Sequence, residues 1–312
     1  MRKPAMKLPN FLIIGVQKAG TTSVYHYLKQ HPQIYMSPVK ETNFLERDWE
    51  SVDPAIRAQV NQERVRQGRL ERIDTFEKYR DLFNVVTDEI AIGEASPNYL
   101  FHYPSSSRLI QHYVPQAKLI AILRNPVDRA YSDYLMHVRE AINVKESLTE
   151  QIRRFPEHQS FTLKKGFYYE PLSHYFNVFD PHQIKVYLYD DLCHDPLAMM
   201  QNLYQFLGVD STFVADTSKR EQVAQVPKSS LMNQVLRTRN PMRSVAASAL
   251  KLIVPVDTRQ YLRDRLIQIN SAEKSKAQPL STEARHNLLN IYRDDILNLQ
   301  DLIQRDLSVW LA

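Results

Sequence analysis

The chain has 312 residues, which is enough for one large domain or two small ones with a proper hydrophobic core. Hydrophobic residues make up 43% and charged residues 24%, as in a soluble globular protein, and no apolar run approaches the roughly 18 residues of a membrane span. The net charge of +5 suits an anionic ligand, although a solvated basic surface is the commoner explanation, and the single cysteine, Cys193, excludes an intrachain disulfide.

The first predicted strand covers residues 10–16 and leads through a small polar loop into an amphipathic helix. Gly15 and Gly20 have the spacing of a Walker phosphate-binding loop, but Thr21 stands where that loop has its lysine. The only lysine of the loop is Lys18. We expect Thr21 or Thr22 to cap the helix, and a histidine followed by a proline at 31–32 to end it.

The rest of the chain alternates between apolar runs and amphipathic segments. Residues 46–90 contain a polar, arginine-rich stretch that predicts an inserted helical segment or lid. Apolar runs predict strands over 34–38, 90–95, 117–124 and 184–192. Periodic segments predict helices over 105–115, 125–138, 171–179, 196–208 and 281–303, the last capped by Ser281.

This alternation is typical of an α/β protein with a parallel sheet, here of four or five strands. We expect one domain over residues 1–312, with a C-terminal helical part over about 210–312. Ligands of such sheets bind at the carboxyl ends of the strands, where the loops after Val16 and after Leu123 both fall.

The two loops indicate binding of two anions. Glycines let the backbone of the first loop approach a phosphate, and the N–H groups at the start of the next helix can bind it. The strand over 117–124 ends in Arg124, where a magnesium-dependent kinase would need a carboxylate. A second anion, rather than a metal ion, is the natural partner of Arg124.

Residues 15–28, GVQKAGTTSVYHYL, resemble the 5′-phosphosulfate loop of sulfotransferases that use phosphoadenosine phosphosulfate (PAPS), and LRNPVDRAYSDY at 123–134 resembles their 3′-phosphate element. KETNFL at 40–45 resembles the segment that carries a catalytic glutamate in the heparan sulfate sulfotransferases. The resemblance covers most of the chain, and residues 46–90 are its least familiar part. It implies a P-loop-like three-layer domain, with a central parallel sheet flanked by helices.

The resemblance also implies the roles of individual residues. Lys18 would stabilise the charge that develops on the bridging oxygen, so no metal is required. Arg124 and Ser132 would hold the 3′-phosphate, and Lys228 is either a further phosphate ligand or an ordinary exposed lysine. The residues expected around the 5′-phosphosulfate are Lys18, Ala19, Gly20, Thr21, Thr22 and Ser23.

Transfer to an acceptor needs a general base, and Glu41 matches the glutamate of the heparan-type enzymes. Its alternative interpretation is a surface glutamate paired with Lys40 or with a nearby arginine. Glu94 resembles a family position near the acceptor, but Ala95 follows it where the glycosaminoglycan enzymes often have lysine. The remaining candidates are a second carboxylate, Glu46, two spare histidines, His102 and His137, and three possible sugar contacts, Tyr168, Tyr169 and His174.

The sequence thus predicts a PAPS-dependent sulfotransferase that acts on a hydroxyl, with an amine as the second choice, of a carbohydrate or small metabolite and releases PAP. An ATP-dependent P-loop kinase and a non-catalytic nucleotide-binding protein remain as alternatives. No nucleic-acid partner and no membrane span are expected. The single cysteine, and an N-terminus without the apolar segment of a signal peptide, predict a cytoplasmic location.

Overall fold

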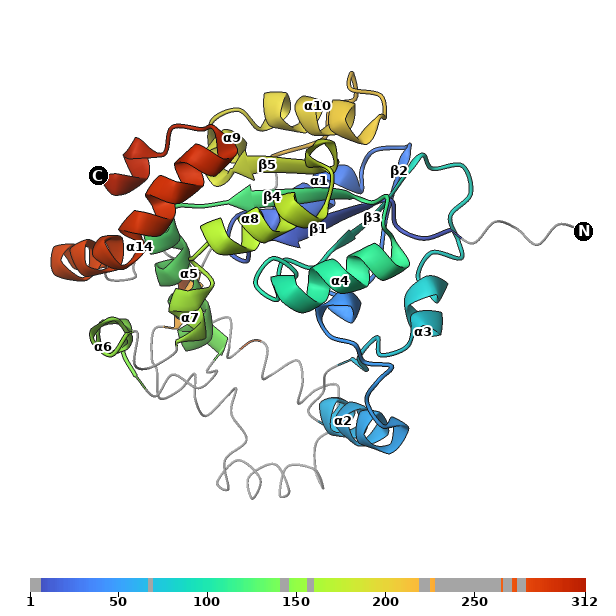
Figure 1. Ribbon diagram of the computed structural model, residues 1–312, viewed down its shortest axis with the longest axis horizontal. Helices are drawn as coiled ribbons and strands as arrows, with labels where there is room; N and C mark the ends of the chain where they lie inside the picture. The colour runs from blue at the N-terminus through green and yellow to red at the C-terminus, as the bar shows by residue number, and fades with distance from the viewer. Residues whose placement is uncertain are drawn as a thin grey trace, which may run out of the picture. The chain divides into compact units, whose positions relative to one another are not determined.

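Five short apolar strands form one parallel sheet in the order β2-β3-β1-β4-β5 (Figure 1). They are β1 (Phe11–Gly15), β2 (Ile34–Met36), β3 (Ala91–Ala95), β4 (Lys118–Leu123) and β5 (Ile184–Leu188). Every residue of β1 and β3 is buried, as expected for strands covered on both faces. The computed structural model describes residues 7–66, 70–140, 146–155, 160–218, 225–227, 265, 271–273 and 279–312.

The chain folds as two compact units. The first consists of Met1–Asn125, Phe167–Glu221 and Asp294–Ala312, and the second of Pro126–Gly166 and Gln222–Arg293. The first unit holds the sheet. Its helices are α1 (Thr21–Leu28), η1 (Phe44–Glu46), α2 (Pro54–Arg66), α3 (Phe76–Asp81), α4 (Tyr103–Tyr113), α8 (Tyr169–Val178), η2 (Pro181–Gln183), α9 (Tyr189–His194), α10 (Pro196–Leu207) and η4 (Ser308–Leu311).

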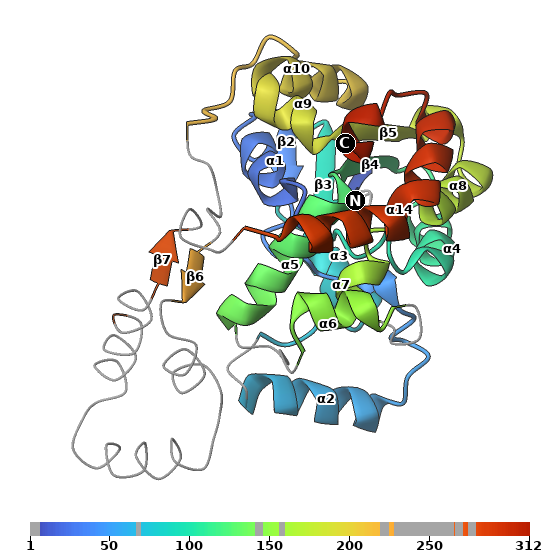
Figure 2. The same ribbon diagram turned by 90° about the vertical axis from the view of Figure 1, so that its left-hand side faces the viewer.

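Helices cover both faces of the sheet. Helix α1 lies on one face, and α4 and α8 lie on the other (Figures 1 and 2). These are the three layers of the predicted α/β fold, and the prediction of a parallel sheet of four or five strands is confirmed. From β1 the chain runs toward the β2 edge, whereas from β4 it runs toward the β5 edge. The carboxyl ends of β1 and β4 therefore flank a topological switch point, the usual ligand site of such sheets.

The second unit consists of helices and a two-stranded sheet. It contains α5 (Pro126–Glu140), α6 (Leu148–Arg153), α7 (Phe161–Lys164) and the antiparallel pair β6 (Gln225–Pro227) and β7 (Ser271–Glu273). Helix α14 (Thr282–Ile303) begins in this unit and ends in the first. Within the second unit the guanidinium of Arg285 pairs with Asp128 at 2.5 Å, and the hydroxyl of Tyr292 donates to the carbonyl of Leu163 at 2.8 Å.

The structure corrects one local prediction, the end of the strand over 184–192, and confirms another, the cap at Ser281. The strand predicted over 184–192 ends at Leu188, because the Asp191 carboxylate accepts the N–H of Leu188 at 2.9 Å and starts helix α9 there. The predicted cap at Ser281 is confirmed, since its hydroxyl accepts the N–H of Ala284 at 3.2 Å. The arginine-rich stretch within 46–90 does contain a helix, α2. The single domain over 1–312 and the C-terminal part over 210–312 stay predictions.

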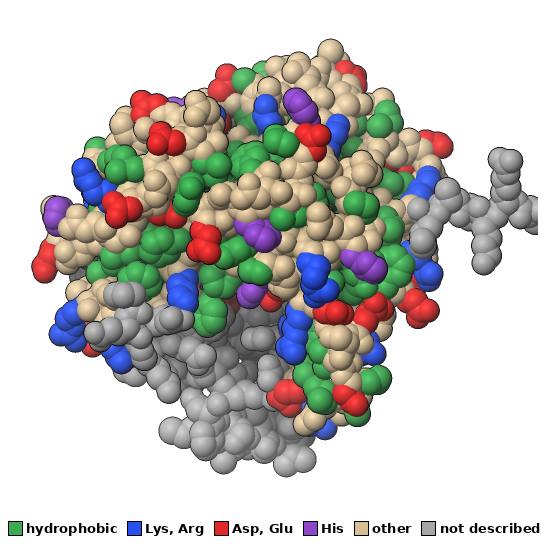
Figure 3. Space-filling view, in the orientation of Figure 1, with side chains coloured by type: hydrophobic (Ala, Val, Ile, Leu, Met, Phe, Trp, Pro, Cys, Tyr) green, Lys and Arg blue, Asp and Glu red, His purple; other side chains and the backbone are tan. Residues whose placement is uncertain are grey.

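The basic excess is not gathered into one patch on the face drawn in Figure 3. Lys and Arg side chains lie there interspersed with Asp and Glu side chains. The charged side chains on this face therefore mark no anion site, and such a site must be found from local geometry.

Gly93 allows the close packing of β3 against β1, and this generates a stability prediction. A Cβ atom at residue 93 would lie 2.1 Å from a ring atom of Phe11, which is fully buried. Gly93→Ala should lower the free energy of unfolding by about 1–3 kcal/mol, the usual cost of overpacking, as measured by urea denaturation. Adding Phe11→Leu should recover part of the loss. Equal stability of Gly93→Ala and the wild type would contradict this packing.

Candidate active site

The loop between β1 and α1 contains two residues in the left-handed backbone region. Lys18 has φ 73° and Gly20 has φ 84°. Glycine is the residue that adopts this conformation without a steric penalty. At Gly20 there is also no space for a side chain, because a Cβ atom would lie 2.6 Å from Leu192 and 3.2 Å from Tyr189. The loop therefore packs tightly against α9.

The start of α1 offers backbone N–H groups to a ligand. Gly20 is the N-cap residue, and no side-chain cap is found for α1 among the described residues. The prediction that Thr21 or Thr22 caps the helix is wrong, because the left-handed Gly20 ends the loop and both threonines lie inside the helix. The first turn has no acidic residue. A helix start of this kind attracts an anion through its N–H groups and its positive dipole end.

Arg124 connects the two sequence motifs. It follows β4, and its Nη1 donates to the carbonyl of Lys18 at 2.9 Å. Its guanidinium lies 4.7 Å from the ring centroid of Tyr189, within range of a cation–π interaction. Its own carbonyl accepts the hydroxyl of Tyr168 at 2.9 Å. Two motifs about a hundred residues apart in sequence thus meet at the switch point.

Two predicted cofactor residues are not placed with this group. Ser132 lies on α5 in the second unit, where it is buried. Lys228 lies outside the described residues. Their assignment to the 3′-phosphate and to the cofactor phosphates stays a prediction.

Glu41 lies beyond the carboxyl end of β3. Its N–H donates to the carbonyl of Ala95 at 2.8 Å, and its backbone has φ 61°. The carboxylate pairs with Lys40 at 2.7 Å and is 39% exposed. The pairing with Lys40 that is expected of a surface glutamate is therefore present. The carboxylate is still exposed enough to contact a ligand.

A cavity of about 340 Å³ adjoins Glu41. One wall is the segment from Val39 to Asn43, and the other comes from the insertion, with Arg64 and Arg72. Burial and the neighbouring Arg64 lower the pKa of Arg72. The ring of Trp49 lies 4.3 Å from the Arg72 guanidinium. The arginine-rich insertion therefore shares a cavity with the candidate base.

Glu94, the alternative base, is wholly buried. Its carboxylate accepts four hydroxyl hydrogen bonds, at 2.5–2.8 Å, from Thr42, Tyr79, Ser96 and Tyr99. An ionised carboxylate only accepts hydrogen bonds, which suits four donors. Burial and the Glu94 charge hold the pKa of Tyr79 well above its usual value. This enclosure gives Glu94 no surface from which to reach an acceptor.

The Glu94 cluster fixes the loop that carries Glu41. Thr42 donates directly to Glu94, and its neighbour Asn43 donates its N–H to the Ser96 hydroxyl at 3.1 Å. The N–H of Leu45 donates to the hydroxyl of Tyr99 at 3.2 Å. Sequence reasoning found Glu94 but missed these partners, because they come from separate segments of the chain.

The other candidate residues have structural partners. Glu46 pairs with His102 at 3.3 Å. In the second unit, His137 bonds to Thr162 at 3.4 Å. His174 bonds to the Ser107 hydroxyl at 2.9 Å, while Tyr168 is buried. None of these five candidates, Glu46, His102, His137, His174 and Tyr168, lines the cavity beside Glu41.

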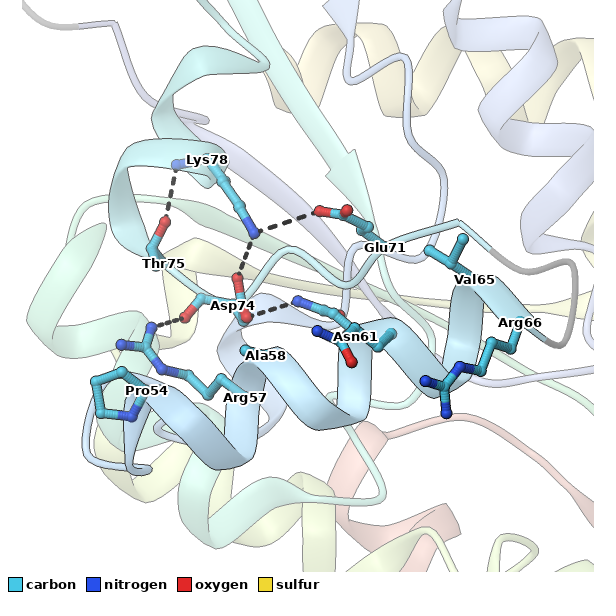
Figure 4. Close-up of a pocket in the computed structure, with 11 residues that line it drawn as sticks. Pro54, Arg57, Ala58, Asn61, Val65, Arg66, Glu71, Asp74, Thr75 and Lys78 are labelled. Atoms are coloured by element: carbon cyan, nitrogen blue, oxygen red, sulfur yellow. Dashed lines mark hydrogen bonds and ion pairs between the residues drawn. The ribbon is translucent and has the colours of Figure 1, made fainter.

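The insertion is held by polar contacts around Asp74 (Figure 4). From α2, Arg57 donates to the Asp74 carbonyl at 3.0 Å and Asn61 to its carboxylate at 2.8 Å. From α3, Lys78 pairs with the same carboxylate at 2.9 Å. These residues border a cavity of about 660 Å³. Arg57, Asn61, Asp74 and Lys78 bind one another there, so these contacts attach α2 to Asp74 and α3.

The described residues contain no group of three or more His, Cys, Asp or Glu side chains that could hold a metal ion. None of the described helices combines the length and the apolar character that crossing a membrane requires.

Known proteins resemble this chain over most of its length. The profile of the sulfotransferase family matches residues 9–213. Bifunctional heparan sulfate N-deacetylase/N-sulfotransferase 3 of Homo sapiens is 32% identical over 221 residues, covering 66% of this chain and 23% of that protein. Carbohydrate sulfotransferase 15 of Homo sapiens is 27% identical over 257 residues, covering 65% and 44%. The chain thus spans less than half the length of these relatives.

A solved structure supports the fold over the whole chain. The sulfotransferase from Alicyclobacillus acidocaldarius is 27% identical and superposes with a TM-score of 0.67. The comparison covers 98% of this chain and 100% of that one.

The Glu94 cluster generates the second prediction. Tyr79→Phe keeps the ring but removes a hydrogen bond to a buried charge, so the free energy of unfolding should fall by about 1.5–3 kcal/mol in chemical denaturation. The control is Tyr35→Phe, because the Tyr35 hydroxyl donates to the neutral carbonyl of Leu82 at 2.7 Å. That variant should lose only about 0.5–1.5 kcal/mol. Equal losses would show that the charge on Glu94 contributes nothing.

Proposed function

Because the chain belongs to the sulfotransferase family, we propose that it transfers a sulfuryl group from PAPS to a hydroxyl of a carbohydrate or small metabolite and releases PAP. The observation that carries the proposal is the hydrogen bond from Arg124 to the carbonyl of Lys18. It supports a cationic site for a second phosphate beside the first loop, at the strand end where a kinase would need a carboxylate for magnesium.

The donors present suit the two phosphate groups of PAPS. The uncapped N–H groups at the start of α1, with the Thr22 and Ser23 hydroxyls, would hold the 5′-phosphate. The guanidinium of Arg124 has five N–H donors, and the Lys18 carbonyl takes one of them. The remaining donors would bind the 3′-phosphate, together with Ser132 and Lys228 if those residues act as the family motif implies.

Lys18 and Glu41 would carry out the chemistry. The acceptor oxygen forms a bond to sulfur while the bond from sulfur to the bridging oxygen breaks. Lys18 would stabilise the negative charge left on the bridging oxygen. Glu41 would take the proton of the acceptor hydroxyl. Both residues lie beyond the carboxyl ends of neighbouring strands, β1 and β3.

The cavity beside Glu41 would receive the acceptor. Arg64 and Arg72 line it and can donate hydrogen bonds to acceptor oxygens, which suits a polyhydroxylated molecule. The printed names of the two human relatives, which concern heparan sulfate and carbohydrate, favour a saccharide. The cytoplasmic location expected from the single cysteine stays a proposal.

Lys18→Ala tests the reaction. With an acceptor found by screening saccharides against radiolabelled PAPS, kcat should fall by about a hundredfold or more, the usual effect of removing a preorganised transition-state donor. PAP affinity should change much less. Added EDTA should leave wild-type turnover unchanged, and Lys29→Ala, at the exposed end of α1, serves as the control. Near-normal kcat with only a raised KM for PAPS would reject the catalytic role of Lys18.

Glu41→Gln tests the base. The change preserves shape and removes basicity, so kcat should fall by a factor of about 10² to 10⁴ while PAP affinity stays nearly constant. Glu77→Gln, an exposed glutamate of α3, controls for loss of surface charge. A variant that keeps most of its rate would make Glu41 an ordinary surface residue.

A further inference from the structure

We propose that Tyr168, held in place by Asp295, is a positioning residue that fixes Arg124 for recognition of the 3′-phosphate. This inference rests on the proposed function, because it assigns Arg124 to that phosphate. The sequence suggested Tyr168 as a sugar contact, and the inference gives it a different role. Tyr168 and Asp295 both belong to the first unit, as do Arg124 and Lys18.

The hydroxyl of Tyr168 contacts the arginine directly. The side chain is 1% exposed, which leaves it no surface for a saccharide. Its hydroxyl donates to the carbonyl of Arg124 at 2.9 Å. On its other side Arg124 donates to the Lys18 carbonyl and stacks on Tyr189. The backbone and the guanidinium of this arginine are thus each held by a separate contact.

Asp295 fixes Tyr168 from the C-terminal helix. Its carboxylate accepts the N–H of Tyr168 at 2.8 Å and the N–H of Tyr169 at 3.1 Å. Tyr168 is the N-cap residue of α8 and has no side-chain cap of its own among the described residues. Asp295 therefore caps α8 from a distant part of the chain. A continuous series of contacts leads from α14 through Tyr168 to Arg124 and the phosphosulfate loop.

Asp295, on α14, is partly buried, and the charged side chain that acts on it is Glu170 of the first turn of α8. Burial chiefly, with a smaller contribution from Glu170, raises the pKa of Asp295 to about 6, although the N–H groups of Tyr168 and Tyr169 lower it in part. The stability that Asp295 gives the folded state is present below its ordinary pKa and is lost as the pH rises through about 6. At neutral pH the charged carboxylate strengthens the hydrogen bonds from the two N–H groups but does not raise the free energy of unfolding.

Tyr168→Phe tests the inference by ligand binding. Calorimetry should show PAP affinity reduced by about 2–10-fold, the worth of one net hydrogen bond. Affinity for adenosine 5′-phosphosulfate, which lacks the 3′-phosphate, should change by less than about twofold. Arg124→Ala is the reference and should remove most of the discrimination between the two ligands.

Tyr175→Phe is the matched control. Tyr175 lies on the same helix α8, is fully buried, and donates its hydroxyl to a backbone carbonyl, that of Tyr99, at 3.0 Å. Both variants should lose similar thermal stability, but only Tyr168→Phe should lose PAP affinity. Equal losses of PAP affinity in the two variants, or equal losses of both ligands in Tyr168→Phe, would overturn the inference.

Asp295→Asn adds a measurement, the pH dependence of PAP binding, that a purely structural role of Asp295 would leave unchanged. Asparagine has one acceptor oxygen, as a protonated carboxyl effectively has, so the variant resembles the wild type below pH 6. The ratio of PAP dissociation constants, variant to wild type, should be about 3–10 at pH 7.5 and near one at pH 5. Titration of PAP, which is the same ligand in both measurements, cancels in this ratio. A ratio that does not change with pH would overturn the role of Asp295.

These results also separate the inference from the proposed function. A wild-type protein that binds neither PAP nor adenosine 5′-phosphosulfate, or binds both equally, would refute the assignment of Arg124. A wild-type protein that prefers PAP, with the same preference in Tyr168→Phe, would leave that assignment intact and refute the positioning role alone.

Discussion

The hydrogen bond between Arg124 and the carbonyl of Lys18 joins two strand ends into one site. A parallel sheet places the loops after β1 and β4 at the same edge, but adjacency alone does not fix a loop. The left-handed backbone at Lys18 turns its carbonyl toward β4, and the guanidinium holds it there. The loop conformation, the start of α1 and the placement of the arginine therefore depend on one another.

A buried charge fixes the other half of the site. Glu94 sits at the end of β3 with four hydroxyl donors, and those donors belong to the segments that flank Glu41 and the insertion. A buried carboxylate tolerates no loss of partners, because an unsatisfied charge in the interior is costly. The loop of Glu41 is thus attached to the sheet by electrostatics, while the phosphate loop is attached by backbone geometry.

Much of this arrangement could be predicted from local sequence. The apolar runs over β1 and β4 and the alternation of elements determine the sheet, and the two loop motifs indicate the candidate phosphate site. What sequence reasoning missed depends on contacts between distant segments. Thr21 has the chemistry of a cap, but the left-handed Gly20 decides where α1 begins. The hydroxyl of Tyr168 and the carbonyl of Arg124 are 44 residues apart, and no local pattern records that they meet.

The polar attachment of α2 has a thermodynamic consequence. Asn61 is the buried residue of this helix, and Arg57 and Asn61 connect it to Asp74. Detaching such a helix exposes little apolar surface, so the heat-capacity change of that step is small, whereas unfolding the sheet exposes the apolar core and has a large one. Cooling or mild heating therefore changes the free energy of detaching α2 and the free energy of unfolding the sheet by different amounts. The amide hydrogens of α2 would therefore exchange with solvent through a local opening whose free energy is far below that of the strands.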